Sequence, residues 1–366
     1  MKISRLATQI VLLPNDEPLA GFSENPNAKN PIVTLRLGTD AGLEGIGVSY
    51  FGGALTRSLK LAVDELGALA VGEDPLAIER VRAKLSEAAG GSGPDGMFAM
   101  ALSAIDLALW DLKGKAAGLP LWKLLGGGRE RIATYASGAL RRGLSNDQAA
   151  EAGRRLRERG HRQAKMQLGL PGRTSPVREV ERARIVREAV GPEMVLMCDI
   201  NQRWRADEAI DIGRRLEDAG IGLFWLEDVT AHDDYPGLAR VAAALKTPIA
   251  GGEYLWGTAP FRHMLEARSV DIPMIDQVRS GGVTPWLRVA HMADAFNLPV
   301  VSHGVPEIHL HLVGAAPNGL TVEYMPRLFA LWKDVPAPQN GELVLPGAPG
   351  LGLEFDDRAI ARYAAG

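Results

Sequence analysis

The chain has 366 residues, of which 46% are hydrophobic and 23% charged, close to the average for globular proteins. This composition excludes a disordered or fibrous chain, and a net charge of −3 leaves no basic excess to attract nucleic acid. A single cysteine, Cys198, excludes an internal disulfide and favours the reducing cytoplasm. No apolar run reaches the length of about 18 residues that predicts a membrane span.

Residues 1–128 predict an α+β domain. A long polar loop at 14–31 separates the first two predicted strands, and a loop of that length is either functional or disordered; we interpret it as a mobile lid. The pattern becomes helical from 54 to 118 and ends at Gly118, with Pro120 beyond it. Three antiparallel strands are predicted, over residues 3–13, 32–37 and 45–50.

Residues 129–326 alternate short apolar strands with amphipathic helices, which predicts a parallel β/α barrel. A doubly wound open sheet would alternate similarly, but no glycine-rich dinucleotide turn follows a strand. The segment 327–366 predicts a hairpin over 341–355 and a short helix, and we expect it to return to the N-terminal domain. The strands are predicted to end near Ser137, Gln167, Asp199, Glu227, Glu253, Asp276, His303 and Glu323.

Three consecutive barrel strands are predicted to end in carboxylates. Asp199, Glu227 and Glu253 would converge at one mouth of the barrel, because catalytic groups of this fold lie at the C-terminal strand ends. Each acid could instead cap the helix that follows it. Three converging carboxylates repel one another unless a cation neutralises them, and hard oxygen ligands suit Mg²⁺, with Mn²⁺ as a substitute.

The second barrel strand carries a lysine at the predicted mouth. In RQAKMQ the strand alternation places Lys165 and Gln167 on the same inward face. A lysine there is costly unless it faces an anion such as a substrate carboxylate or an enolate, although a lysine can also extend from the barrel rim to water.

The sixth and seventh strands end in Asp276 and His303, which adjacent strands bring within reach of each other. A carboxylate beside an imidazole fixes its tautomer and makes His303 a usable general base and then a general acid. His303 alone could equally be a rim histidine. Glu323, on the eighth strand, could donate a hydrogen bond to an enolate if protonated or pair with Lys165 if ionised. His309 and His311 are assigned to packing, because residues two apart on a helix face different sides.

The order and spacing of several motifs resemble the mandelate racemase subgroup of the enolase superfamily. The helical stretch GMFAMALSAIDLALWDLKGKAAGLPLWKLLGG also resembles the helix-to-barrel joint of its acid-sugar dehydratases. The motifs of the barrel are QAKMQLG, CDINQRW, FWLED, GGEYLWG, DQVRSGG, SHG and TVEY.

The resemblance implies an α/β fold, a modified TIM barrel of the (β/α)₇β type with an N-terminal α+β capping domain completed by the C-terminal tail. It implies that Asp199, Glu227 and Glu253 hold Mg²⁺, that His303 and Asp276 form a dyad, and that Glu323 donates a hydrogen bond to the enediolate. Contacts with the metal ligands or with substrate are expected for Gln167, Asn201, Asp228, Arg279 and Trp256. The family usually has a second Glu followed by Pro where this chain has Asp228 and Val229.

Gln167 is the main departure from the subgroup, whose second-strand motif ends in a basic residue. An amide cannot be a general base, so the resemblance leaves His303 as the base on one face of the substrate. Lys165 is carried over as the partner of the substrate carboxylate. One histidine can serve a syn elimination, so the leading hypothesis is Mg²⁺-dependent dehydration of a sugar acid to a 2-keto-3-deoxy acid, a reaction of carbohydrate-acid catabolism.

Two other functions stay open. One is racemisation, epimerisation or cycloisomerisation of a sugar acid or 2-hydroxy acid through the same enediolate. The other is a non-catalytic, metal-dependent acid-sugar binder, since loss of a basic residue is what a lapsed enzyme would show. The resemblance suggests a homo-oligomer, an octamer or a smaller even assembly. The identity of the acid and its stereochemistry are not determined by the sequence.

Overall fold

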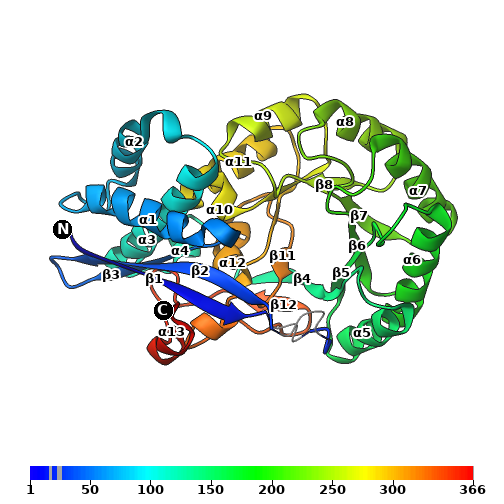
Figure 1. Ribbon diagram of the computed structural model, residues 1–366, viewed down its shortest axis with the longest axis horizontal. Coiled ribbons are helices and arrows are strands. Elements are labelled where there is room, and N and C mark those ends of the chain that lie inside the picture. The colour runs from blue at the N-terminus through cyan, green and yellow to red at the C-terminus, as the bar shows by residue number, and fades with distance from the viewer. Residues whose placement is uncertain (16–18, 23–26, 366) are drawn as a thin grey trace.

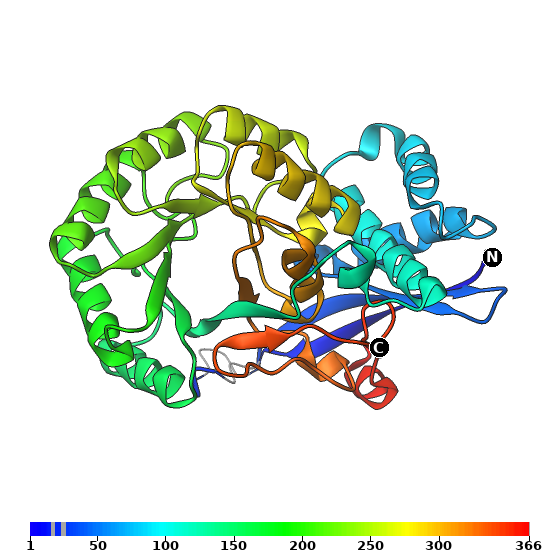
Figure 2. The same ribbon diagram turned by 180° about the vertical axis from the view of Figure 1, so that it is seen from behind.

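A computed structural model describes residues 1–15, 19–22 and 27–365. The chain forms a capping domain with a three-stranded sheet beside a barrel ringed by helices (Figure 1). Seen from behind, the C-terminal segment runs along the junction of the two parts (Figure 2). Among the described residues, no helix is both long and apolar enough to cross a membrane. The predicted lid at 14–31 lies partly outside the described residues, so its mobility stays a prediction.

The capping domain contains the three predicted antiparallel strands, which pair in the order β1-β2-β3. The long buried helix α3 lies against β3 so closely that a Cβ atom at Gly47 would lie 2.0 Å from the Ala104 carbonyl oxygen. Gly118 ends this helix in the left-handed conformation, as predicted. The elements are β1 (Ile3–Pro14), β2 (Lys29–Thr39), β3 (Glu44–Ser49), α1 (Thr56–Ala70), α2 (Ile78–Ala89) and α3 (Gly96–Ala117).

The barrel has eight parallel strands, which confirms the predicted fold class. Helices follow every barrel strand except the last, β11, so the chain has the (β/α)₇β arrangement. The strands are β4 (Arg131–Leu140), β5 (Gln163–Gln167), β6 (Val195–Asp199), β7 (Leu223–Glu227), β8 (Ile249–Gly251), β9 (Ile272–Ile275), β10 (Val301–Ser302) and β11 (Val322–Tyr324). The helices are α5 (Asn146–Glu158), α6 (Pro176–Val190), α7 (Ala206–Asp218), α8 (Tyr235–Ala244), α9 (Ala259–Glu266), α10 (Gln277–Ser280), α11 (Val283–Ala295) and α12 (Pro306–Ala315).

The strand ends place the predicted polar residues at one mouth of the barrel. Asp199 ends β6 and Glu227 ends β7, and the two residues are direct neighbours in the sheet register. Asp276 and His303 follow β9 and β10 immediately. Below them the barrel interior is filled by an apolar plug, so the polar groups rest on a packed floor. Buried residues of this plug include Tyr135, Met197, Trp225, Met274 and Val301.

The C-terminal segment corrects one expectation. The predicted hairpin over 341–355 is wrong, because β12 (Glu342–Val344) pairs with β4 of the barrel instead of with the following residues. An unpaired edge beside β4 offers ladder hydrogen bonds that a local turn of Pro and Gly residues cannot match. The predicted helix is present as α13 (Asp357–Tyr363), and just beyond it the Ala365 N–H donates to the Ile10 carbonyl of β1 at 2.9 Å. The tail therefore joins the barrel and the capping sheet.

Candidate active site

A cavity of about 310 Å³ opens at the mouth of the barrel, where the predicted polar residues meet a loop of the capping domain. Phe51 comes from the capping domain, and the other lining residues come from the barrel and the segment after it. These are Ser137, Gly138, Arg141, Lys165, Gln167, Asp199, Asn201, Glu253, Tyr254, Arg279, His303, Glu323, Met325 and Arg327.

Three buried acids at the ends of β6 and β7 form a carboxylate cluster. One oxygen from each of Asp199, Glu227 and Asp228 lies within 4.8 Å of the others. Burial raises the pKa of Asp199 to about 6 and that of Glu227 to about 8, in both cases against the attraction of Lys165. Burial and the charges of Glu253 and Glu227 raise the pKa of Asp228 well above its usual range. Burial and mutual repulsion therefore both disfavour the ionised forms of these three acids.

The membership of this cluster differs from the predicted ligand set, because Asp228 stands in it where Glu253 was expected. Asp228 has a positive φ of 43° directly after β7, and its Oδ2 atom has no hydrogen-bond partner among the described residues. Glu253 instead points to the histidine side of the cavity, where its Oε2 lies 3.3 Å from His303 Nε2. Glu253 lines the cavity and Asp228 does not. A cation that also binds substrate in the cavity would have Glu253 as its third ligand, whereas a cation inside the buried cluster would have Asp228.

Lys165 is buried at the centre of the site and pairs with two carboxylates. Its Nζ lies 2.5 Å from Glu227 Oε1 and 2.8 Å from Glu323 Oε1. Burial would lower the pKa of Lys165, but these two charges raise it well above its usual range. Burial would likewise raise the pKa of Glu323, but Lys165 lowers it to about 2. Of the two alternatives for Glu323, the 2.8 Å contact favours the pairing with Lys165 over the role of a protonated donor.

His303 and Asp276 form the predicted pair, with 2.7 Å between His303 Nδ1 and Asp276 Oδ2. Burial would lower the pKa of His303, but Glu253 and the hydrogen bond to Asp276 raise it to about 9. Asp276 also caps α10 by accepting from the Arg279 N–H at 2.8 Å, so its carboxylate is held from two sides. The remaining ring nitrogen, Nε2, lies on the Glu253 side.

The turn after His303 is held by the helix that follows it. The Gly304 N–H donates to Glu323 Oε2, and the Gly304 carbonyl lies 2.7 Å from His309 Nδ1. Val305 adopts a left-handed conformation with φ of 40°, which is strained for a β-branched residue. His311 contacts the Leu351 carbonyl at 3.0 Å through Nε2. Both histidines are buried and bonded to backbone, in keeping with their predicted packing role, and His309 also supports the catalytic turn.

The side of the cavity opposite His303 carries an amide network instead of a base. Gln167 Nε2 donates to Asn201 Oδ1 at 3.2 Å, and Gln167 Oε1 accepts from the Arg142 N–H at 3.4 Å. The Arg142 guanidinium also donates to Asn201 Oδ1, and Asn201 Nδ2 donates to the Tyr254 hydroxyl at 3.3 Å. Gln167 and Asn201 therefore hold each other in place and have no proton to exchange at neutral pH.

The two remaining predicted contacts lie in different places. Arg279 lines the cavity, and its guanidinium lies 4.0 Å above the Phe51 ring and donates to the Glu253 carbonyl at 2.8 Å. Trp256 lines another cavity, beside Phe98 and Pro285, where it is partly buried against the capping-domain core. Trp256 does not line the cavity at the barrel mouth, so the expected substrate contact has no support in the geometry.

Several functional neighbours were missed by sequence reasoning. Trp225 donates from Nε1 to Glu227 Oε2 at 3.0 Å, and the two-residue spacing in FWLED could have indicated it, since alternate strand residues share a face. Tyr254 follows Glu253 directly and could have been inferred from GGEY. Phe51 lies in the glycine-containing loop after Tyr50, which the sequence predicts to close over the barrel mouth, but its contact with the His303 ring depends on how the two domains pack.

The family assignment rests on both parts of the chain. An α+β cap over a (β/α)₇β barrel with acids, a lysine and a histidine at its mouth is the architecture of an enolase-type barrel protein. Residues 9–126 match the mandelate racemase/muconate lactonizing enzyme N-terminal domain, and residues 147–359 match the enolase C-terminal domain-like family. The chain therefore belongs to the mandelate racemase and muconate lactonizing enzyme family of the enolase superfamily.

Relatives with named activities cover nearly the whole chain. The chain is 33% identical to L-talarate/galactarate dehydratase of Salmonella typhimurium, over 92% of this chain and 83% of the relative. It is 32% identical to 3,6-anhydro-alpha-L-galactonate cycloisomerase of Streptomyces coelicolor, over 100% of both chains. A solved structure of L-talarate dehydratase from Polaromonas sp. JS666, complexed with Mg and L-glucarate, superposes with a TM-score of 0.91 at 30% identity and covers 100% of this chain and 98% of that one.

Proposed function

We propose that this protein is a Mg²⁺-dependent acid-sugar dehydratase that converts a sugar acid to a 2-keto-3-deoxy acid. The observation that carries the proposal is the asymmetry of the cavity. The His303–Asp276 pair stands on one side, and the Gln167–Asn201 amide network stands on the other. A site with one base suits an elimination in which the proton and the hydroxyl leave from the same face.

The carboxylates fit a hard divalent cation. Asp199, Glu227 and Asp228 are buried within 4.8 Å of one another, their pKa values are raised, and Asp228 Oδ2 lacks a partner among the described residues. We assign Asp199 and Glu227 as ligands, with Glu253 as the third because it faces the cavity where substrate must enter, and Asp228 as their supporting acid. Bound Mg²⁺ would offset the charge of Glu253 and the negative charge that develops on the substrate carboxylate.

Lys165 supplies the fixed positive charge of the protein itself. It lies in the cavity wall between Glu227 and Glu323 and is ready to bind a substrate carboxylate oxygen. Because Glu323 is ionised and bonded to Lys165, its role here is to position that lysine, which differs from the hydrogen-bond donor role that the family resemblance implies. Preorganised charge of this kind stabilises a transition state without reorganisation during the reaction.

The proton transfers are assigned to a single nitrogen. With Nδ1 bonded to Asp276, His303 Nε2 takes the proton from the carbon next to the substrate carboxylate. The same nitrogen then returns it to the β-hydroxyl as the carbon–oxygen bond breaks, so water leaves. The enol that remains tautomerises to the 2-keto-3-deoxy acid. Gln167 and Asn201 contact the substrate from the other side and exchange no proton.

The proposal is tested by a 2-keto product assay with Mg²⁺-loaded protein across a library of sugar acids. We expect turnover of at least one acid, loss of turnover in His303→Asn, and unchanged turnover in His291→Asn, a control on the exposed surface of α11. Absence of product from every acid, or full activity of His303→Asn, would contradict a dehydratase. Binding without turnover or deuterium exchange would instead indicate the non-catalytic binder.

Cycloisomerisation is the second candidate, favoured by the full-length similarity to the Streptomyces coelicolor cycloisomerase. It would use the same base, but the departing oxygen would be part of a ring in the substrate and would stay attached to the product. Adding anhydro sugar acids and sugar-acid lactones to the library separates the two reactions. Racemisation is disfavoured by Gln167, and deuterium incorporation next to the carboxylate without elimination would reinstate it.

A further inference from the structure

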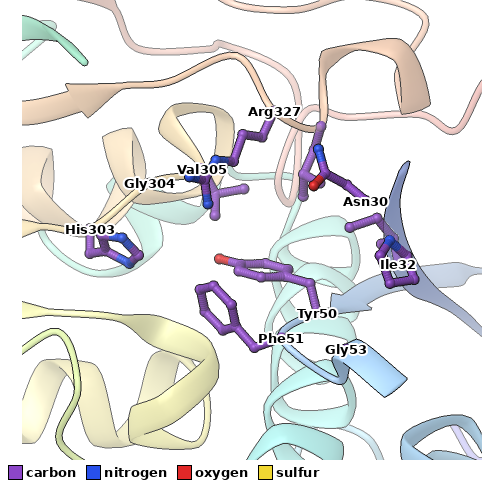
Figure 3. A pocket seen from close by; sticks show the side chains of 11 residues that line it. Asn30, Ile32, Tyr50, Phe51, Gly53, His303, Gly304, Val305 and Arg327 are labelled. Atoms are coloured by element: carbon purple, nitrogen blue, oxygen red, sulfur yellow. The ribbon is translucent and has the colours of Figure 1, made fainter. Parts of the chain in front are cut away.

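A second cavity of about 220 Å³ lies between the capping domain and the barrel, beside the catalytic cavity. Figure 3 shows the rings of Tyr50 and Phe51 projecting from the capping domain toward His303, Gly304 and Val305 of the barrel. We call this space the distal chamber. Its lining residues are Asn30, Pro31, Ile32, Tyr50, Phe51, Gly53, His303, Gly304, Val305, Arg327 and Leu328.

The distal chamber adjoins the catalytic cavity. Phe51, His303 and Arg327 line both spaces. Phe51 stands at their boundary, stacked at 6.0 Å between ring centroids on His303, and it has a positive φ of 71°. The chamber is therefore the space beyond Phe51 that lies nearest to the far end of a substrate whose acidic carbon is at His303.

The wall of the chamber is apolar, and most of its polar groups are already engaged. Ile32 and Leu328 are buried side chains, and Pro31 and Val305 complete the aliphatic surface. The Asn30 amide donates to Asn15 Oδ1 at 3.1 Å. The backbone N–H and carbonyl of Gly304 bind Glu323 and His309. Hydroxyl groups placed against this wall would lose water without gaining partners.

The Tyr50 hydroxyl and the Arg327 guanidinium also line the distal chamber. The Tyr50 hydroxyl is buried and has no hydrogen-bond partner among the described residues, so it can satisfy one polar atom of a ligand. The Arg327 guanidinium lines both cavities but belongs to an exposed residue, and an ion pair with water access contributes little. Among the described residues the chamber therefore offers few polar atoms: the buried Tyr50 hydroxyl, the Asn30 Oδ1 of a half-buried side chain, and the Arg327 guanidinium at its rim.

We propose that the distal chamber binds the end of the substrate remote from the reacting carboxylate, and that this end is a methyl or similarly apolar terminus with at most one hydroxyl nearby. A terminal hydroxymethyl group or a second carboxylate fits less well. This inference rests on the proposed function for the direction in which the substrate lies. Apolar pockets discriminate by roughly 10- to 200-fold per methylene-sized change, so the preference is expected in that range.

The test uses three acids of one configuration: a hexonate, its 6-deoxy form and the corresponding hexarate. Dissociation constants are measured by calorimetry with Mg²⁺-loaded His303→Asn protein, so that binding is read without turnover, and kcat/KM is measured with the natural sequence. We expect the 6-deoxy acid to bind at least about tenfold more tightly than the other two. Equal binding, tighter binding of the hexonate or hexarate, or no binding of any acid overturns the inference. Loss of turnover with the binding order intact overturns only the proposed function.

Two variants examine the chamber itself. Tyr50→Phe removes the buried hydroxyl of the chamber, and it should increase the ratio of 6-deoxy to parent affinity, whereas Tyr363→Phe on α13 should leave that ratio unchanged. Ile32→Asn adds a polar group to the wall and should reduce the ratio several-fold, with circular dichroism as the check that the protein folds. A ratio that neither substitution moves would show that the terminus does not enter the chamber.

Discussion

The two sides of the catalytic cavity differ in what they can do with a proton. On one side His303 is bonded to Asp276 at 2.7 Å and presents its second nitrogen to the cavity. On the other side Gln167 and Asn201 are bonded at 3.2 Å, and Arg142 and Tyr254 complete their hydrogen bonds. Both sides are ordered by hydrogen bonds, but only the His303 side presents an imidazole that can accept or donate a proton, whereas Gln167 and Asn201 are amides. This difference is the basis for our proposal that His303 is the single base of the cavity.

The largest expected effect comes from removing the base. His303→Asn should reduce kcat by about 10²- to 10⁴-fold, the usual contribution of a general base, with little change in substrate affinity. Stopped-flow or steady-state product assays measure this directly. If His303→Asn were as active as the natural sequence, a group on the Gln167 side would have to move the proton. That result would contradict the assignment of His303 as the single base.

The second-largest effect is expected on Mg²⁺ binding, when one of the carboxylates of the proposed metal site is replaced by an amide. Glu253→Gln should weaken Mg²⁺ binding more than Asp228→Asn does, because Glu253 faces the cavity and Asp228 lies behind it. For a supporting residue such as Asp228 the loss is expected to be about 10- to 100-fold. Calorimetric titration with Mg²⁺ measures both variants. The reverse order would show that the buried cluster of Asp199, Glu227 and Asp228 is the metal site.

A smaller effect is expected from the turn that carries the base. His309→Gln removes the ring that holds the Gly304 carbonyl, so His303 should lose alignment and kcat should fall by about tenfold, with a shifted pH profile, because small displacements of a catalytic group are costly. The matched control is His311→Gln, a buried histidine bonded to Leu351. That control should lower the melting temperature but keep the pH profile of kcat. If both variants had the same pH profile of kcat, His309 would have only a packing role.

The smallest effect is expected on the amide side. Gln167→Ala should change kcat/KM by less than about tenfold, because Gln167 transfers no proton and contributes only a contact. Gln167→Lys sharpens the comparison, since a base on the second face should allow deuterium from solvent to enter next to the carboxylate. Nuclear magnetic resonance of recovered substrate detects this exchange. A loss of activity in Gln167→Ala as large as that of His303→Asn would contradict the one-sided assignment.

The chain by itself determined the barrel and most of the site. Strand alternation and spacing are local properties, and parallel strands in a barrel share one C-terminal mouth, so the sequence alone places Asp199, Glu227, Asp276 and His303 together. The amide at Gln167 was visible for the same reason. Whether Glu323 pairs with Lys165 depends on how closely the two side chains approach, which the strand order does not determine.

Only the tertiary structure decided the features that depend on side-chain direction or on packing between distant segments. Asp228 joins the carboxylate cluster because a positive φ after β7 turns it back, and Glu253 points to His303 instead. The pairing of β12 with β4 replaced a predicted local hairpin. The distal chamber exists because Tyr50 and Phe51 of the capping domain meet the turn at His303. Such contacts join segments that are far apart in the chain, so they produce no periodic pattern in the sequence. They form only when the whole domains pack together.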